Sequence, residues 1–328
     1  MILQRVLFPS ENRPKELYMR DKGEWVSFDT FFNSFSIEKW EKYTNLKNLL
    51  IKVNLKNYDE TFNIKVYNKK LVKNKIEIIE IKTIRKEHNV YEICNLGEIK
   101  KGIIYFEIEQ KYLNKISKID YISENVHNIN QNKVNLALII CTYKREAYVQ
   151  KFLDSFSRII KKNFIKNRMK VYIVDNAKTL SLLQTPENVK IFKNKNYGGA
   201  GGFTRGIIEA VRDKAPHILL MDDDIEIEES ILERLLSFLI ILKKEYREYF
   251  IGGSMLIKEK PKIQCEKVGI WKKYRNVSIG KNKNLTNEKE VLINENEEKI
   301  KLKYAAWWFC CFSVDNVKKR GLPSPFFI

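Results

Sequence analysis

The sequence is short of the features that mark several classes of protein. Only 13 glycines and 7 prolines occur among 328 residues, and 44% of the residues are hydrophobic, which excludes collagen-like and low-complexity chains. The five cysteines contain no CxxC pair, and the three histidines are too scattered for a zinc site. We therefore expect free thiols, buried in apolar segments, in a reducing compartment.

Long hydrophobic runs are also missing. The longest, LLSFLIIL at 235–242 and AAWWFCCFSV at 305–314, fall short of the roughly 20 residues that cross a bilayer. The opening residues, MILQRVLFPSENRPKE, lack the apolar core of a secretory signal. We expect a cytoplasmic protein and leave open a peripheral contact with the inner membrane.

Acidic residues are few relative to basic ones. With 60 Lys and Arg against 41 Asp and Glu, the formal net charge is +19, which suits an anionic partner such as nucleic acid, an acidic membrane surface or a phosphate-bearing substrate. The lysines are spread along the chain and no nucleic-acid-binding motif occurs. We therefore favour a nucleotide or a membrane surface, and expect no nucleic-acid partner.

The first part of the chain has the pattern of an all-β domain. Segments such as FNIKVYN and KIEIIEIKTI alternate apolar and polar residues and are separated by turn-forming residues, which predicts a β-sandwich over residues 1–128. Aromatic residues cluster near its start, and we interpret them as core in preference to a carbohydrate-binding surface: Trp25, Phe28, Phe31, Phe32, Phe35 and Trp40.

After a polar linker the pattern changes to alternating strands and helices, which predicts an open, mainly parallel α/β sheet over residues 129–328. The expected strands are 134–141, 170–175, 189–194 and 217–221, and the expected helices are 147–161, 203–214 and 228–246. Ligands bind such sheets at the carboxyl ends of the strands. The charged segment 258–303 is expected to be a hairpin or flap over the site, or a solvated loop.

Polar side chains follow every predicted strand of this sheet. Thr142 and Arg145 follow the first, Asp175 ends the second and Asn196 follows the third, while Asp222, Asp223 and Asp224 follow the fourth. An edge that carries both basic residues and a carboxylate cluster suits a metal–diphosphate, since Mg²⁺ or Mn²⁺ is held by one or two carboxylates plus substrate phosphates.

A glycine-rich segment, NYGGAGGFTRG at 196–206, leads from the third predicted strand into the second predicted helix. Its glycines permit close approach of a ligand to the backbone, and the helix N-terminus that follows, with Arg205 in its first turn, favours anions. The segment lacks the GK[ST] of a P-loop and does not follow the first strand as a dinucleotide-binding GxGxxG would.

Taken in order, CTYKRE, VDNA, NYGGAGGFTRG, LLMDDDI and AAWWFCCF resemble the bacterial galactofuranosyltransferases, which are inverting glycosyltransferases of family 2 with a GT-A fold. The resemblance covers nearly the whole chain, including the β-sandwich. It implies transfer of galactofuranose from UDP-galactofuranose, with Mn²⁺ or Mg²⁺, to a glycan or lipid-linked acceptor in the synthesis of a cell-surface polysaccharide such as lipopolysaccharide.

The resemblance also assigns roles to individual residues. Asp222 and Asp224 would hold the metal in a DxD motif, and Asp223 would lie near the donor sugar. The expected nucleotide-sugar contacts are Thr142, Arg145, Asp175, Asn196, Gly198, Gly199, Gly201, Gly202, Arg205, Trp307 and Trp308. Asp175 would bond the uracil or, alternatively, cap the next segment.

No catalytic base is identified. In the resembling family a base aspartate follows the segment that here reads GLPSPFFI, so we expect the base beyond Ile328 and a C-terminally incomplete domain. Three alternatives stay open: a rhamnosyltransferase with a dTDP donor, a truncated relative that binds a nucleotide sugar without turnover, and a nucleic-acid-binding protein suggested by charge alone.

Overall fold

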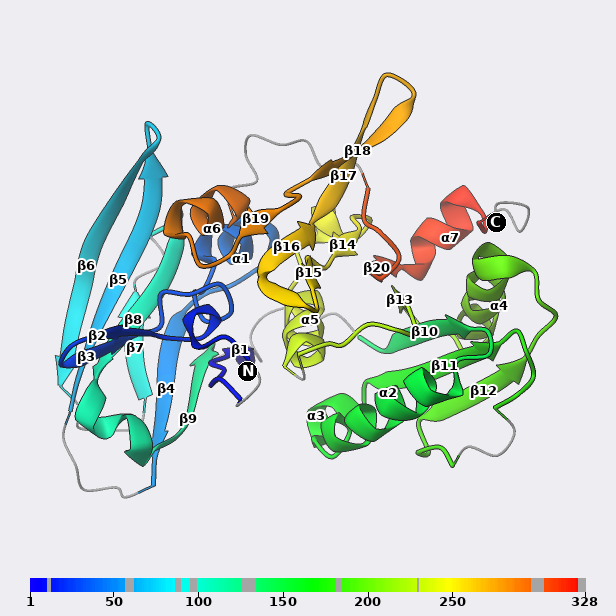
Figure 1. Cartoon of the computed structure of the whole chain (residues 1–328), viewed down its shortest axis with the longest axis horizontal. Coiled ribbons are helices and arrows are strands. Elements are labelled where there is room, and N and C mark those ends of the chain that lie inside the picture. Colours follow the sequence, from blue (N-terminus) through cyan, green and yellow to red (C-terminus); the bar gives the residue numbers. More distant parts are fainter. Residues whose placement is uncertain are drawn as a thin grey trace. The chain divides into compact units, whose positions relative to one another are not determined.

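The computed structural model describes residues 1–10, 13–56, 62–85, 90–94, 99–124, 134–180, 184–228, 230–295 and 304–323. The chain forms two compact units (Figure 1). The first contains residues 1–131, 241–243 and 254–303, and the second contains 132–240, 244–253 and 304–328. The segment 254–303, which falls within the predicted second domain, groups with the first unit.

The first unit contains two antiparallel sheets. One has the order β1-β9-β4-β7, and the other has the order β2-β3-β8-β5-β6. Their strands are β1 (Ile2–Arg5), β2 (Arg20–Lys22), β3 (Trp25–Ser27), β4 (Leu49–Leu55), β5 (Asn63–Val72), β6 (Lys75–Arg85), β7 (Val90–Cys94), β8 (Ile103–Glu109) and β9 (Ile116–Ile122). Helix α1 (Ile37–Tyr43) and the 3-10 turns η1 (Lys15–Leu17) and η2 (Gln110–Lys115) connect them.

Aromatic rings fill the core of this unit. Phe35 lies between Trp40 and Tyr121, with ring centroids 5.5 Å and 5.1 Å away. Phe28 stacks on Phe106 at 4.7 Å. Phe28, Phe35 and Trp40 are buried, which confirms the core interpretation for these three aromatics.

The segment 254–295 adds small strands and a helix to the first unit. These are β15 (Met255–Ile257), β16 (Lys260–Glu266), β17 (Val268–Lys272), β18 (Arg275–Ile279), β19 (Lys283–Asn284) and α6 (Glu288–Glu295). Ion pairs connect α6 to the rest of the first unit. The Lys69 ammonium, 1% exposed, lies 2.5 Å from Asp29 and 3.7 Å from Glu288, the first residue of α6. Arg20 also pairs with Glu288 at 3.2 Å.

The second unit is a six-stranded mixed sheet with the order β12-β11-β10-β13-β20-β14. The expected parallel α/β sheet is present, and its four parallel strands are β10 (Leu136–Thr142), β11 (Met169–Asp175), β12 (Val189–Lys193) and β13 (His217–Met221). Antiparallel β20 (Phe309–Ser313) and the short β14 (Ile251–Gly252) complete it. The connecting helices and turn are α2 (Glu146–Ile159), α3 (Asn163–Lys166), α4 (Gly198–Arg212), α5 (Ile231–Ile240), η4 (Lys244–Tyr246) and α7 (Val314–Arg320).

The predicted helix over 228–246 was too long. Helix α5 ends at Ile240, and the chain then enters the first unit, where Leu242 forms a β-bridge with Thr44 and Asn45 donates to the Ile241 carbonyl at 2.8 Å. Backbone pairing over 241–243 has replaced the helical bonds that the apolar periodicity predicted. None of the described helices is long and apolar enough to span a membrane.

Candidate active site

The carboxyl ends of the parallel strands bring the predicted polar residues to one edge of the second unit. In the register of the sheet Thr142 lies beside Asp175, and the Asp175 carbonyl accepts from the Asn194 N–H at 2.9 Å. Asp222 directly follows β13, the other neighbour of β10. Four separate segments of the sequence therefore meet there.

Direct hydrogen bonds connect the first and fourth of these strand ends. The Thr142 hydroxyl donates to the Asp223 carboxylate at 2.6 Å. The Arg145 guanidinium donates to Asp223 at 3.1 Å and to Asp224 at 2.5 Å. Arg145 lies between two carboxylates and supplies positive charge where the sequence predicted a cation.

The three aspartates have different surroundings. The Asp223 side chain is nearly buried, whereas that of Asp224 is 43% exposed. No described side chain donates a hydrogen bond to Asp222, and burial, followed by repulsion from Asp224 and Asp223, raises the pKa of its carboxyl group. Arg145 thus pairs with Asp223 and Asp224, while Asp222 is repelled by both of these carboxylates.

Asp175 does not present a free carboxylate. It is 1% exposed, and it accepts hydrogen bonds from the backbone N–H groups of Ala177, Lys178 and Leu180 at 3.0, 2.7 and 2.9 Å. This geometry matches the capping alternative instead of the expected uracil contact, because the carboxylate already orders the loop that follows β11.

The glycine-rich segment is helical, which differs from the expected loop. Helix α4 begins at Gly198, and a Cβ added at Gly201 or Gly202 would lie 2.4 Å from Tyr197 Cβ or 2.0 Å from Cys141 Sγ. Those two glycines therefore allow close packing, Gly202 against β10, not approach of a ligand. Gly199 is exposed and has open space around its Cα.

The residues around the start of α4 are tied to the strand ends. The Asn196 side chain accepts from the Gly198 N–H at 3.1 Å. The Asn176 amide donates to the Gly198 carbonyl at 3.1 Å and accepts from Asn194 at 2.9 Å. These amide bonds fix the helix N-terminus, which favours anions, at the edge that carries the aspartates.

Arg205 is not in the first turn of the helix. Because α4 begins at Gly198, the rise of about 1.5 Å per residue places Arg205 about 10 Å further along the axis. Its guanidinium pairs with Glu209 at 2.8 Å and lies over the Phe192 ring. In this conformation Arg205 does not join the aspartate cluster.

The tryptophan pair reaches the edge through an antiparallel strand. Met221 at the end of β13 pairs with Phe309 at the start of β20, so Trp307 and Trp308 lie beside the start of the aspartate segment. Both are half-buried. Trp307 contacts the Phe203 ring edge-on at 5.3 Å, and the Trp308 indole donates to the Gly253 carbonyl at 2.9 Å.

Exposed tyrosines near this edge were not predicted. Tyr143, Tyr148 and Tyr197 are each roughly half exposed, at 46%, 51% and 56%, and the Arg145 guanidinium lies 5.7 Å from the Tyr148 ring centroid. The positions of Tyr143 directly after a buried strand and of Tyr197 directly before a glycine-rich helix were the available signal. Cys141 precedes Thr142 in β10, and burial with repulsion from Asp223 and Asp222 raises the pKa of its thiol to about 12.

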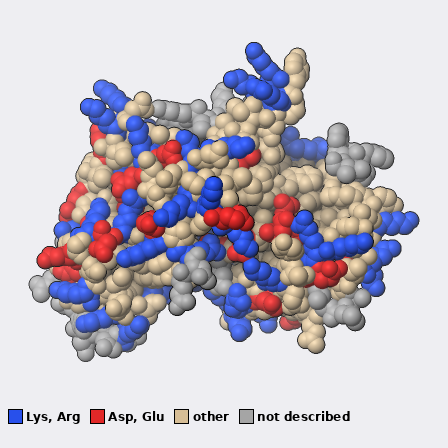
Figure 2. Space-filling view, in the orientation of Figure 1, with Lys and Arg blue, Asp and Glu red and all other residues tan. Residues whose placement is uncertain are grey.

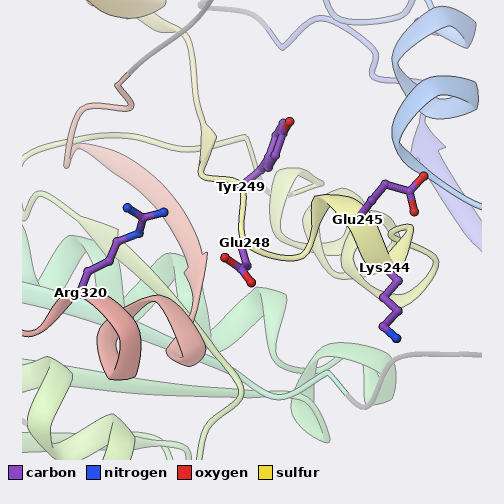
Figure 3. A pocket seen from close by; sticks show the side chains of 5 residues that line it. All are labelled: Lys244, Glu245, Glu248, Tyr249 and Arg320. Atoms are coloured by element: carbon purple, nitrogen blue, oxygen red, sulfur yellow. The ribbon is translucent and has the colours of Figure 1, made fainter.

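A hollow of about 620 Å³ in this unit lies away from the edge that carries the aspartates. Figure 3 shows the residues that line it, which are Lys244, Glu245, Glu248, Tyr249 and Arg320. Arg320 ends α7, which follows the end of β20 that pairs with His217 at the start of β13. The hollow therefore lies toward the sheet edge opposite the aspartates, and none of the predicted site residues lines it.

Sequence comparison assigns this unit to a class. Residues 137–260 match the family described as Glycosyl transferase family 2, so the second unit contains a family 2 glycosyltransferase domain. Residues 21–124 match the family described as Galactofuranosyltransferase 2 N-terminal. In these two regions the chain is therefore similar to galactofuranosyltransferases of glycosyltransferase family 2, which agrees with the resemblance of the sequence motifs.

Curated relatives agree with this class. Galactofuranosyltransferase GlfT2 of Mycolicibacterium smegmatis is 22% identical over 92% of this chain and 49% of its own length. The protein of the same name from Mycobacterium tuberculosis is 21% identical over 92% of this chain and 50% of its own. The chain thus spans about half the length of these relatives.

Among solved structures, the crystal structure of S. aureus TarS 1-349 is similar over 37% of this chain and 36% of that chain, at 22% identity and a TM-score of 0.30.

Proposed function

We propose that this chain binds a nucleoside-diphosphate sugar at the aspartate edge of its second unit and takes part in metal-dependent, inverting transfer of the sugar. The observation that carries the proposal is the hydrogen-bonded contact of Thr142 and Arg145 with Asp223 and Asp224 inside a family 2 glycosyltransferase domain. We also propose the GT-A arrangement for this unit and a β-sandwich for the first.

The carboxylate cluster fits a hard divalent cation. Among the described residues no group of three Cys, His, Asp or Glu side chains is arranged as a metal cage. A metal–diphosphate does not need one, because one or two carboxylates and the substrate phosphates suffice. Repulsion among Asp222, Asp223 and Asp224, which Arg145 offsets by pairing with the last two, supports a site for Mn²⁺ or Mg²⁺ held by Asp222 and Asp224. The ion would neutralise charge that develops on the leaving diphosphate.

The other residues of the site would have separate roles in binding the diphosphate and the sugar. Arg145 is the nearest cation to the aspartates and would stabilise the diphosphate once released from Asp224. Thr142 holds Asp223 in place, and Gly199 at the start of α4 offers an exposed backbone to an anion. Trp307 and Trp308 would form one wall for the sugar or acceptor. Asp175 would act through the loop that it orders.

In the transfer itself, an acceptor hydroxyl oxygen forms a bond to the anomeric carbon while the bond to the diphosphate oxygen breaks on the opposite face. The hydroxyl proton must pass to a base. We assign no base among the residues described.

We propose UDP-galactofuranose as the donor and a glycan or lipid-linked saccharide as the acceptor, in agreement with the galactofuranosyltransferase N-terminal match. A dTDP donor with rhamnose is the second candidate. A nucleotide-sugar-binding protein without turnover is the third, and it requires the same donor site.

Calorimetric titration of UDP into the full chain, with and without Mn²⁺, tests the donor site. We expect Mn²⁺-dependent binding that is lost in Asp222→Ala/Asp224→Ala. Asp315→Ala is the matched control, since Asp315 is an exposed carboxylate on α7 whose ion pair within the described residues is with Lys318 of the same helix. Binding unaffected by the double substitution, or equally reduced by the control, would contradict the assignment. Parallel titration of dTDP separates the two donor classes.

A further inference from the structure

The segment 254–295 carries a two-stranded hairpin with an unusual tip. Strands β17 and β18 pair only with each other among the described strands, from Val268 opposite Ile279 to Lys272 opposite Arg275. In Figure 1 the hairpin projects beyond the other strands of its unit. Every residue from 271 to 276 is exposed.

The tip combines large aromatic side chains with positive charge. Trp271 is 63% exposed and Tyr274 is 94% exposed, which is the highest value among the exposed large apolar residues of the described chain. Lys272, Lys273 and Arg275 stand between and beside them, and none of the three pairs with an acidic residue that the structure describes. Residues 268–287 contain no Asp or Glu at all. Figure 2 shows basic side chains gathered at the end of this projection.

The backbone at the tip has a conformation that lysine and tyrosine rarely adopt. Lys273 and Tyr274 have φ values of +44° and +67°, a two-residue turn in which Asn-Gly is the preferred pair. A lysine and a tyrosine here cost conformational free energy that the turn itself does not recover. Their side chains gain no packing in return, because both are exposed.

The base of the hairpin, in contrast, is held firmly. Val268 is buried, Ser278 donates to Glu266 at 2.6 Å, and Gln264 donates to the Gly280 carbonyl at 2.6 Å. An isolated two-stranded ribbon is only marginally stable. The contacts at the base therefore stabilise the hairpin that carries the exposed tip.

From this geometry we propose that the β17–β18 tip docks the protein on an anionic lipid bilayer. Trp and Tyr side chains favour the interface between lipid headgroups and acyl chains, where the ring is apolar and the polar end stays wet. Clustered lysines and arginines are attracted to anionic headgroups. A nucleic acid would match the charge, but the apolar ring of Trp271 and the narrow two-stranded tip favour a bilayer surface.

Sedimentation of the full chain with phospholipid vesicles tests the proposal. The probes are vesicles of phosphatidylcholine alone and of phosphatidylcholine mixed with phosphatidylglycerol. We expect binding to the mixed vesicles, little binding to the neutral ones, and weakening by added salt. Lys272→Gln/Lys273→Gln should reduce binding about thirty-fold, because each lysine near an anionic surface contributes about 1 kcal/mol.

A matched control exists at another hairpin turn of the same unit. Lys73→Gln/Lys75→Gln removes the same charge at the β5–β6 turn, where Lys73 and Asn74 also have positive φ values, and should change binding little. Trp271→Ala/Tyr274→Asn should weaken binding several-fold while keeping a turn-compatible residue. In the wild type, vesicles should shift tryptophan emission to shorter wavelength, and Trp271→Phe should abolish that shift.

Several outcomes would overturn the proposal. One is absence of binding to the mixed vesicles by folded protein, and another is an equal loss in the tip and control variants. Tip-dependent binding to single-stranded RNA in preference to vesicles would assign the hairpin to nucleic acid instead. None of these measurements depends on the donor site, and UDP titration should be unchanged in the tip variants.

Discussion

The two kinds of glycine in α4 give the sharpest prediction. A Cβ at Gly202 would lie 2.0 Å from Cys141 Sγ and 3.1 Å from Asn176 Nδ2, both in the packed junction with the sheet. At Gly199 an added Cβ meets nothing within 4 Å. Gly202→Ala should therefore destabilise the protein, whereas Gly199→Ala should be tolerated.

The magnitudes follow from two opposed effects. Overpacking costs about 1–3 kcal/mol, and the overlap at Gly202 is severe enough to displace the packed Cys141 side chain, which places the cost at the upper end. Alanine recovers up to about 1 kcal/mol of helix propensity. We expect a net loss of about 2 kcal/mol for Gly202→Ala, or roughly 4–8 °C in Tm, and a gain of about 0.4–1 kcal/mol for Gly199→Ala.

Thermal unfolding of the full chain measures both changes, and Cys141→Ala provides the internal test. Removing the Sγ atom leaves the two Cβ atoms 3.2 Å apart, which small movements accommodate. The double variant Cys141→Ala/Gly202→Ala should therefore be more stable than the sum of its single changes by more than 1 kcal/mol, by the rule for residues in contact. A Gly202→Ala protein of full stability that has lost UDP binding would refute this reasoning, because it would show that the glycine serves the ligand.

Two further predictions concern buried titratable groups. Burial, followed by repulsion from Arg247, lowers the pKa of His217 from its ordinary 6.5 to about 4; the unfolded chain then binds more protons in this window, so stability is present above pH 6.5 and is lost as pH falls toward 4. The loss between pH 7 and pH 5 should be about 2 kcal/mol in urea unfolding, and a His217→Asn protein that kept the same slope would contradict it. In the first unit, Lys69→Met should cost about 3–5 kcal/mol because it leaves Asp29 buried without its partner, whereas Asp29→Asn/Lys69→Met should recover most of that loss. Equal stability of the single and double variants, measured by the same unfolding assay, would show that the pair is not coupled.

The parallel strands of the second unit could be predicted because both of their faces are buried. Continuous apolar runs such as HILLM leave few alternatives, and β13 spans the expected residues, 217–221. Because Thr142 and Asp222 each follow a strand that was expected to be parallel, both residues were expected at the same edge of the sheet. Topology, with no knowledge of distances, was enough to predict the edge that carries the candidate site.

The glycine-rich segment could not be predicted in the same way. Glycine disfavours a helix interior by about 1 kcal/mol relative to alanine, so four glycines within five residues indicate a loop. The structure instead uses Gly202 and Gly206 to bring α4 close to Cys141 and Ile139 of β10. Tertiary packing has overridden local propensity, and only the three-dimensional contact distinguishes a packing glycine from one that faces a ligand. Asp175 is similar, because its three backbone partners lie in an irregular loop.

The position of the tryptophan pair depends on a single antiparallel strand. Had β20 run parallel to β13, Trp307 and Trp308 would have preceded its amino end at the opposite edge of the sheet, far from the aspartates. The reversed direction pairs Met221 with Phe309 and brings the tryptophans to the edge of Asp222. Strand direction cannot be read from the apolar run FCCFS, whose residues are all buried. The resemblance, not the pattern, linked the two motifs, and the register of one strand pair gives that link a physical basis.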